Sequence, residues 1–157
     1  MGSEMCIRDS YSTLMVGSKL VFPGPKMGDG EALYELLETE KVTVAAGVPT
    51  VWLALLQYCE QNGKTLNALQ RTVIGGAAVP RSMIEQFSKV HDVQAIQGWG
   101  MTEMSPLGTA NTPKAGQEGF SDEERFDLAT KAGRGIFGCE LRIVDDEGSE
   151  LPWDGVA

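Results

Sequence analysis

The chain has 157 residues, with 13 Lys or Arg against 22 Asp or Glu, and a formal net charge of −9. Its composition, 42% hydrophobic and 22% charged, is typical of one globular domain with a sizeable core. The negative charge argues against non-specific binding of nucleic acid or of an anionic membrane, and no apolar run approaches the ~20 residues that span a bilayer.

The cysteines and the histidine of the chain argue against several kinds of site. Cys6, Cys59 and Cys139 are widely separated and form no CxxC pair, so neither a disulfide framework nor a zinc site is indicated. We therefore expect reduced thiols and a cytoplasmic protein. The single histidine, His91, follows a helical pattern and is expected at a solvated helix end, which argues against a histidine-based catalytic triad.

The N-terminal part of the chain divides into a prefix, a strand and a helix. Residues 1–10 have no periodicity and contain a second methionine, Met5, so we interpret them as a non-native prefix and begin the domain at residue 11. The apolar segment Leu14–Phe22 predicts a strand interrupted at Gly17. Leucines at helical spacing, opposite a row of glutamates, predict a helix over Asp29–Glu40.

A second strand and helix follow. Val42–Gly47 predicts a short apolar strand, and Pro49 opens a helix, a position that proline favours. The apolar residues of this helix recur at helical spacing: Trp52, Leu55, Leu56 and Cys59. Asn62-Gly63 predicts its end. The segment Arg71–Ile74 predicts the next strand, which leads into a pair of glycines.

The central helix is predicted to begin at Pro80. Its expected apolar stripe consists of Val79, Met83, Phe87 and Val90. Ser82 and Glu85 have the spacing of a capping box. The segment Val93–Gln97 then predicts another strand.

The C-terminal third is more polar. Asn111–Gly119 predicts a loop, and Ser121–Glu124 matches a capping box at the start of a short helix. Leu141–Val144 predicts a strand, and Asp145–Gly148 a turn. Helices that alternate with short apolar strands indicate parallel β-α-β units, so the expected fold is α/β, with a mostly parallel sheet and flanking helices.

Two glycine-rich turns are expected to share one edge of this sheet. Gly75-Gly76-Ala77-Ala78 follows one strand, and Gly98-Trp99-Gly100 follows the next. Ligands in open α/β sheets bind beyond the carboxyl ends of the strands. Either turn alone is explained by tight packing, but two on consecutive strands favour a binding site.

The second turn belongs to the segment Gln97-Gly98-Trp99-Gly100-Met101-Thr102-Glu103. Glycines allow the backbone to approach a ligand closely, and Trp99 offers a flat face to a planar ring. Thr102 offers a hydroxyl to a phosphate oxygen, and Glu103 a hard oxygen ligand for Mg²⁺. Taken singly, these residues fit a core aromatic, a turn residue and a solvated charge; together they favour a nucleotide-phosphate site.

The order of these residues resembles the Gly-Tyr-Gly-x-Thr-Glu motif of adenylate-forming enzymes, which include acyl-CoA synthetases, luciferases and the adenylation domains of peptide synthetases. The resemblance implies that Thr102 binds phosphate and that Glu103 holds Mg²⁺. Trp99 stands where the family's tyrosine packs on adenine. By the same resemblance, the following residues border the nucleotide or the acyl-adenylate: Gly76, Ala77, Ala78, Gln97, Gly98, Gly100 and Met101.

Further segments carry the same resemblance. Val48-Pro49-Thr50-Val51-Trp52 is similar to a family stretch that begins a helix on the acyl side of the pocket, although it also fits a plain helix start. The segment from Gly133 to Asp145 resembles the Gly-Arg-Pro-x-Pro-Gly…Arg-Ile-Val-Asp segment, with Gly135 and Phe137 where prolines are common. The ending Leu151–Gly155 resembles the medium- and long-chain fatty-acid–CoA ligases and the methylmercaptopropionate–CoA ligases.

The resemblance implies that residues 11–157 are a middle fragment of the large N-terminal domain of such an enzyme. The family's phosphate loop, ribose-binding aspartate and catalytic lysine fall outside it. The expected parent activity is an acid–CoA ligase, which uses ATP, Mg²⁺ and CoA to activate a fatty or related carboxylic acid through an acyl-adenylate. We expect the isolated fragment to be inactive, and a homo-oligomer is compatible with the intact protein. The alternatives are a non-catalytic α/β nucleotide-binding module, another adenylate-forming enzyme, or a doubly wound domain without a nucleotide site.

Overall fold

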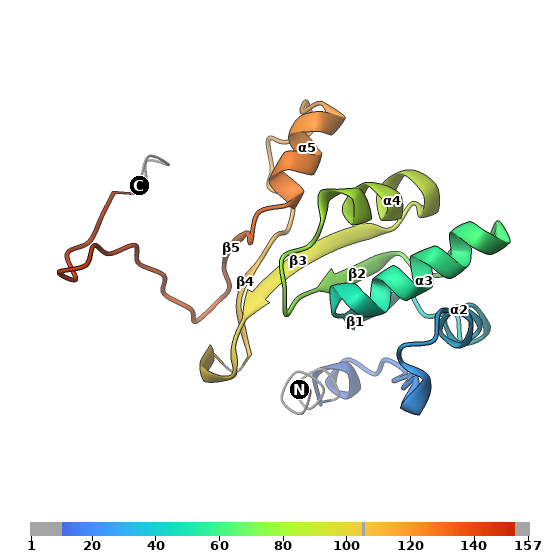
Figure 1. Cartoon of the computed structure of the whole chain (residues 1–157). Helices are drawn as coiled ribbons and strands as arrows, with labels where there is room; N and C mark the ends of the chain where they lie inside the picture. Colours follow the sequence, from blue (N-terminus) through green and yellow to red (C-terminus); the bar gives the residue numbers. More distant parts are fainter. Residues whose placement is uncertain (1–10, 105, 153–157) are drawn as a thin grey trace.

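The computed structural model describes residues 11–104 and 106–152 (Figure 1). Our interpretation of residues 1–10, and the part of the Leu151–Gly155 resemblance that falls on residues 153–155, lie outside these ranges.

One five-stranded sheet organises the described residues, and its strands follow one another in chain order. The strands are β1 (Val44–Gly47), β2 (Arg71–Ile74), β3 (Gln94–Gly100), β4 (Leu107–Ala110) and β5 (Arg134–Gly135). The pairings β1–β2 and β2–β3 are parallel, whereas β3–β4 and β4–β5 are antiparallel. The α/β class with flanking helices is therefore confirmed, and the two antiparallel pairings, both made by β4, make the sheet mixed.

After the helical residues 11–15, the part of the chain that the structure describes contains α2 (Gly30–Thr39), α3 (Pro49–Asn62), α4 (Arg81–His91) and α5 (Asp122–Ala129). Short 3₁₀ turns form at η1 (Gly24–Lys26) and η2 (Thr102–Met104). The predicted ends of α2 and α3 are confirmed. The Asp29 carboxylate accepts a hydrogen bond from the Ala32 amide at 3.0 Å, and Gly63 ends α3 with a left-handed φ of 59°.

The core lies between the sheet and the pair α3 and α4, which pack on the same face of the parallel strands (Figure 1). The Trp52 ring of α3 meets the Phe87 ring of α4 edge-on, with centroids 5.8 Å apart. Thr72 and Ile74 of β2 are fully buried beneath them, whereas Val44 of β1 is 52% exposed. Because successive strand residues point to opposite faces, the residues that face α3 and α4 are buried and their neighbours on the other face are not.

The predicted strand Leu14–Phe22 is wrong. Residues 11–15 are helical, and Gly17, with φ of 71°, ends this turn as its amide donates to the Leu14 carbonyl at 3.0 Å. The apolar side chains that suggested a strand are largely exposed, as with Met15 at 86%. A glycine in the left-handed region explains the segment better than a break within a strand.

Two details of α4 also differ from expectation. The predicted capping box is wrong, because no side chain caps this helix and the Glu85 carboxylate instead binds Arg81 and Lys89. The predicted stripe holds for its first three residues, but Val90 is 56% exposed. Its place on the buried face is taken by Ile84 and by His91.

His91 is not a solvated helix end, as the sequence suggested; it is 6% exposed. Its ring nitrogen Nδ1 accepts a hydrogen bond from the Leu66 amide at 3.3 Å. The chain turns sharply after it at Asp92, where φ is 54°, so that the end of α4 stays under the loop that contains Leu66.

The C-terminal expectations are confirmed in part. The capping box of α5 is present, because Ser121 Oγ accepts from the Glu124 amide and Glu124 accepts from the Ser121 amide. The Asp145–Gly148 turn closes with a hydrogen bond of 3.0 Å. The predicted strand Leu141–Val144 is wrong, since among residues 11–104 and 106–152 it forms a single bridge, between Val144 and Glu150.

Candidate functional site

The loop after β2 lies against β3. The amide of Gly75 donates to the Gly47 carbonyl at 3.2 Å, and a side chain at Gly75 would place its Cβ 3.1 Å from the Gly98 carbonyl oxygen. Gly76 adopts a φ of 84°, which an L side chain rarely adopts. Gly75 therefore allows the loop to pack closely on β3, and Gly76 allows its backbone conformation.

A side chain from β3 secures the same loop. The amide oxygen of Gln97 accepts a hydrogen bond from the Val79 backbone at 3.1 Å. Gly76 is supported from the other side by Val48, the residue before α3, whose methyl carbon would lie 3.2 Å from a Cβ at Gly76. The two glycine turns and the start of α3 thus pack together, in agreement with the prediction that both turns lie at one edge of the sheet.

Beyond this unit, β3 continues past the end of β2 and pairs with β4 (Figure 1). Trp99 lies opposite Thr109, and the register shifts between Trp99 and Gly100. A Cβ at Gly100 would overlap the carbonyl oxygen of Pro106, so this position accepts only glycine. The bulge redirects the chain into the η2 turn.

Trp99 rests on Gly108 of β4. A Cβ at Gly108 would lie 2.8 Å from the edge of the Trp99 ring and 2.7 Å from the Met104 sulfur. The missing side chain makes room for the indole, which remains 42% exposed. Its accessible surface is available to a planar ligand.

Thr102 and Glu103 lie in η2, the turn between β3 and β4, and both are exposed. The turn is closed by the Met104 amide, which donates to the Met101 carbonyl at 3.0 Å. Among the described residues, no group of three or more His, Cys, Asp or Glu could hold a metal ion. A single carboxylate still fits Mg²⁺ bound to a nucleotide, because that ion takes much of its coordination from phosphates and water.

The structure thus brings together Gln97, Gly98 and the Gly75–Val79 loop, and places Trp99 to Glu103 on the adjoining hairpin. Ala77 and Ala78 are exposed on the loop. Sequence reasoning missed the support from β4. Gly108, a glycine between Leu107 and the β-branched Thr109, was the available signal for a strand packed under an aromatic ring.

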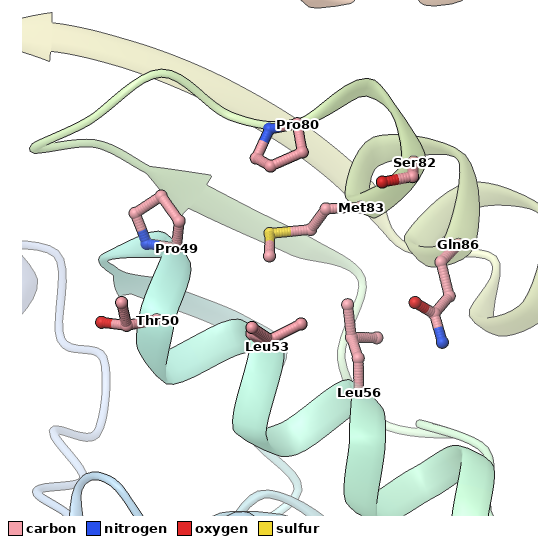
Figure 2. Close-up of a pocket in the computed structure, with 8 residues that line it drawn as sticks. All are labelled: Pro49, Thr50, Leu53, Leu56, Pro80, Ser82, Met83 and Gln86. Carbon is pink, nitrogen blue, oxygen red and sulfur yellow. The ribbon is translucent and has the colours of Figure 1, made fainter.

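The Val48–Trp52 segment borders a separate groove of about 170 Å³ between the N-terminal turns of α3 and α4. Figure 2 shows the Met83 side chain between these helices, with Pro49 and Leu53 on the α3 side. The remaining lining residues are Thr50, Leu56, Pro80, Ser82 and Gln86. This groove lies on the helix-covered side of the sheet.

The side chains whose pKa values differ from their ordinary values lie outside the two glycine turns. Burial raises the pKa of the Cys59 thiol to about 11 and lowers that of His91. Hydrogen bonds from Lys89 and Arg81 lower the pKa of Glu85. These groups support the fold, and Cys59 and Cys139 are free thiols.

Comparison with known proteins decides the family. Residues 4–157 match the family described as AMP-binding enzyme. The chain belongs to this family.

Its relatives include CoA ligases. The chain is 50% identical over 146 residues to 3-methylmercaptopropionyl-CoA ligase from Ruegeria lacuscaerulensis, covering 93% of this chain and 27% of that protein. It is 49% identical to a medium-chain-fatty-acid–CoA ligase from Ectopseudomonas oleovorans, covering 92% of this chain and 26% of that protein. The chain therefore spans about a quarter of the length of these relatives.

Solved structures agree on the fold. A long-chain-fatty-acid–CoA ligase from Archaeoglobus fulgidus is 26% identical with a TM-score of 0.64, covering 79% of this chain and 25% of that one. An anthranilate–CoA ligase solved with anthranoyl-AMP is 25% identical with a TM-score of 0.67, covering 86% of this chain and 24% of that one. The described helices include none long and apolar enough to cross a membrane.

Proposed function

We propose that the protein carrying this chain is an acid–CoA ligase. In its first step, a carboxylate oxygen attacks the α-phosphate of ATP, which gives an acyl-adenylate and releases pyrophosphate. In its second step, the CoA thiol attacks the acyl carbon and AMP leaves. The observation that carries the proposal is the pairing of the Gly75–Val79 loop with Gln97 and Gly98 in a chain similar to CoA ligases along most of its length.

We assign nucleotide binding to the exposed residues on this unit. The exposed backbone of Gly76 to Ala78 can approach the adenine closely, and the accessible surface of Trp99 can stack on it. Thr102 can donate its hydroxyl to a phosphate oxygen. Glu103 supplies a carboxylate for the Mg²⁺ that neutralises the phosphates.

We assign the acyl side to the apolar surface around Gly98. A Cβ at Gly98 would lie 3.2 Å from the Leu107 side chain and 3.6 Å from that of Val73. Met101, which follows β3 and is 48% exposed, offers a further flexible apolar side chain. Fatty and related carboxylic acids, the substrates named for the relatives, suit such a surface.

The test uses a chimaera in which residues 11–157 replace the matching segment of a full-length relative. Acid-dependent ATP–pyrophosphate exchange, followed by formation of acyl-CoA, is the expected result. A correctly folded chimaera that binds ATP without exchange would favour the alternative of a non-catalytic nucleotide-binding module. Exchange without transfer to CoA would favour another adenylate-forming enzyme.

A further inference from the structure

Arg81, the first residue of α4, joins two helices through one guanidinium group. Its Nε donates to Glu85 of the same helix at 2.7 Å. Its Nη2 and Nη1 bind Glu123 at 2.7 Å and Asp127 at 2.6 Å, both on α5. Glu123 and Asp127 are four residues apart, so they share the α5 face that meets α4.

The position of this arginine is unfavourable for α4 itself. A positive charge at a helix N-terminus opposes the helix dipole, so Arg81 does not stabilise its own helix end. Every guanidinium nitrogen already binds a carboxylate, and the three negative charges around it repel a phosphate. The contacts of Arg81 instead attach α5 to α4.

Few other contacts hold α5 against α4. The helix α5 has eight residues, and Phe126 is the one that is buried. Lys89 of α4 lies over the Phe126 ring, 4.9 Å from its centroid. The strand β5 adds only two exposed residues. Isolated exposed ion pairs contribute little, but here one ordered side chain serves three pairs.

From α5 the connection continues to β4. The side-chain amide of Asn111 donates to the carbonyls of Leu128 and Lys131. The Thr109 hydroxyl donates to the Ala132 carbonyl at 2.6 Å. Thr109 is the residue paired with Trp99. The segment that follows α5 is thus bonded to the strand beneath the indole.

We propose that Arg81 is a positioning residue that fixes α5 on α4 and so holds β4 beneath Trp99. Only Pro80 separates Arg81 from the Gly75–Val79 loop, so the same residue connects this loop with the strand beneath Trp99. The catalytic consequence rests on the proposed function, whereas the structural consequence does not.

The structural consequence is tested on the chain itself by amide hydrogen exchange of Arg81→Met. The amides of Asn111 and Ile136, which bond to Gln97 and Gly108 across the antiparallel strands, should exchange roughly five-fold faster. Amides of β2 should not change. The control is Arg125→Met, which removes the same charge from a pair with Asp122 inside α5. Equal protection in the parent chain and Arg81→Met would overturn the proposal.

The catalytic consequence is tested in the chimaera. Arg81→Met should raise KM for ATP roughly five-fold with a smaller change in kcat, whereas Arg125→Met should match the parent. The double variant Glu123→Gln, Asp127→Asn breaks the same contact from the α5 side and should raise KM by a similar factor. Combining it with Arg81→Met should cause no further increase in KM. An unchanged KM, or strictly additive effects, would contradict the proposal. An unsubstituted chimaera without exchange activity would instead contradict the proposed function and leave the hydrogen-exchange result to decide this one.

Discussion

At the scale of single residues, the best-defined relation is that between Trp99 and Gly108. The indole occupies the space that a side chain at Gly108 would need. Trp99→Tyr keeps a ring face and should be tolerated in the chimaera. Trp99→Ala loses the stacking surface, worth about 0.5–1.5 kcal/mol, and should raise KM for ATP roughly two- to ten-fold. Steady-state kinetics over a range of ATP measure both effects.

Gly108→Ala is the matched variant for this prediction, because it displaces the indole without removing it. It should raise KM for ATP in the same direction as Trp99→Ala. If Trp99→Ala and Gly108→Ala both bind ATP like the parent, Trp99 is not the adenine platform.

The η2 turn supports a second prediction at this scale. Glu103→Gln keeps the side-chain shape but removes the charge that Mg²⁺ favours, so adenylation should require more Mg²⁺. Thr102→Val removes a hydroxyl with little change in volume and should weaken adenylation at all Mg²⁺ concentrations. The rate of adenylate formation, measured against Mg²⁺ and ATP, separates the two roles. Parent-like rates for both variants at limiting Mg²⁺·ATP would reduce the motif to a structural turn.

At the scale of elements, two serines show how context decides the role of a cap. Ser121 and Ser82 both begin a serine–glutamate spacing near a helix start. Only Ser121 caps its helix, because it is the N-cap residue of α5, whereas Ser82 lies inside α4, whose N-cap is Pro80. Ser121→Ala should therefore lower the stability of α5 by about 1 kcal/mol, whereas Ser82→Ala should cost well under that. Hydrogen exchange of the α5 amides measures the first and urea denaturation compares both; equal costs would contradict the assignment.

Local signals predicted α2, α3 and α4 because each combines an apolar stripe with a proline, aspartate or glycine boundary. The strand β4 was missed because its four residues show little alternation of polar and apolar side chains. Its pairing with β3, which sets Thr109 opposite Trp99, depends on the fold. Leu141–Val144 failed for the opposite reason. It has strand composition, but within the described residues it gains only one bridge, and strands need partners.

The candidate site was predictable to the extent that it is local. The Gln97–Glu103 motif and the Gly75-Gly76 turn were found in the sequence, and their contact followed from parallel pairing. The hydrogen bond from Val79 to Gln97, the recess at Gly108 and the Arg81 connection depend on residues brought together only by folding. Their roles could not be read from spacing.

At the scale of the whole molecule, the chain spans 26–27% of the length of the two CoA ligases from Ruegeria lacuscaerulensis and Ectopseudomonas oleovorans. We predict that the purified chain alone does not catalyse ATP–pyrophosphate exchange with any fatty acid. The resemblance to adenylate-forming enzymes implies that the catalytic lysine and the phosphate loop lie outside these residues, and each lost donor to the transition state costs on the order of 3 kcal/mol. A radioactive exchange assay tests this, with the chimaera as positive control. Acid-dependent exchange by the chain alone would contradict the fragment interpretation.

Between pH 5 and 7.5 the change of folding stability with pH should come from His91, the only histidine in the chain. Burial lowers its pKa in the folded state from the ordinary value of 6.5, and its Nδ1 must stay unprotonated to accept from Leu66. The unfolded chain therefore binds a proton more readily than the folded chain. The stabilisation is complete above about pH 6.5 and is lost as the pH falls from there towards the folded pKa.

Urea denaturation between pH 5 and 7.5 measures this dependence. The free energy of unfolding should fall with decreasing pH in the parent chain, and His91→Gln should be less stable at pH 7.5 but nearly independent of pH across that window. Glu85 and Glu124 do not interfere, because hydrogen bonds lower their pKa values below the ordinary 4.5 and their contribution is lost only at more acidic pH. A slope that persists unchanged in His91→Gln would assign the effect to another group and contradict the role given to this buried ring.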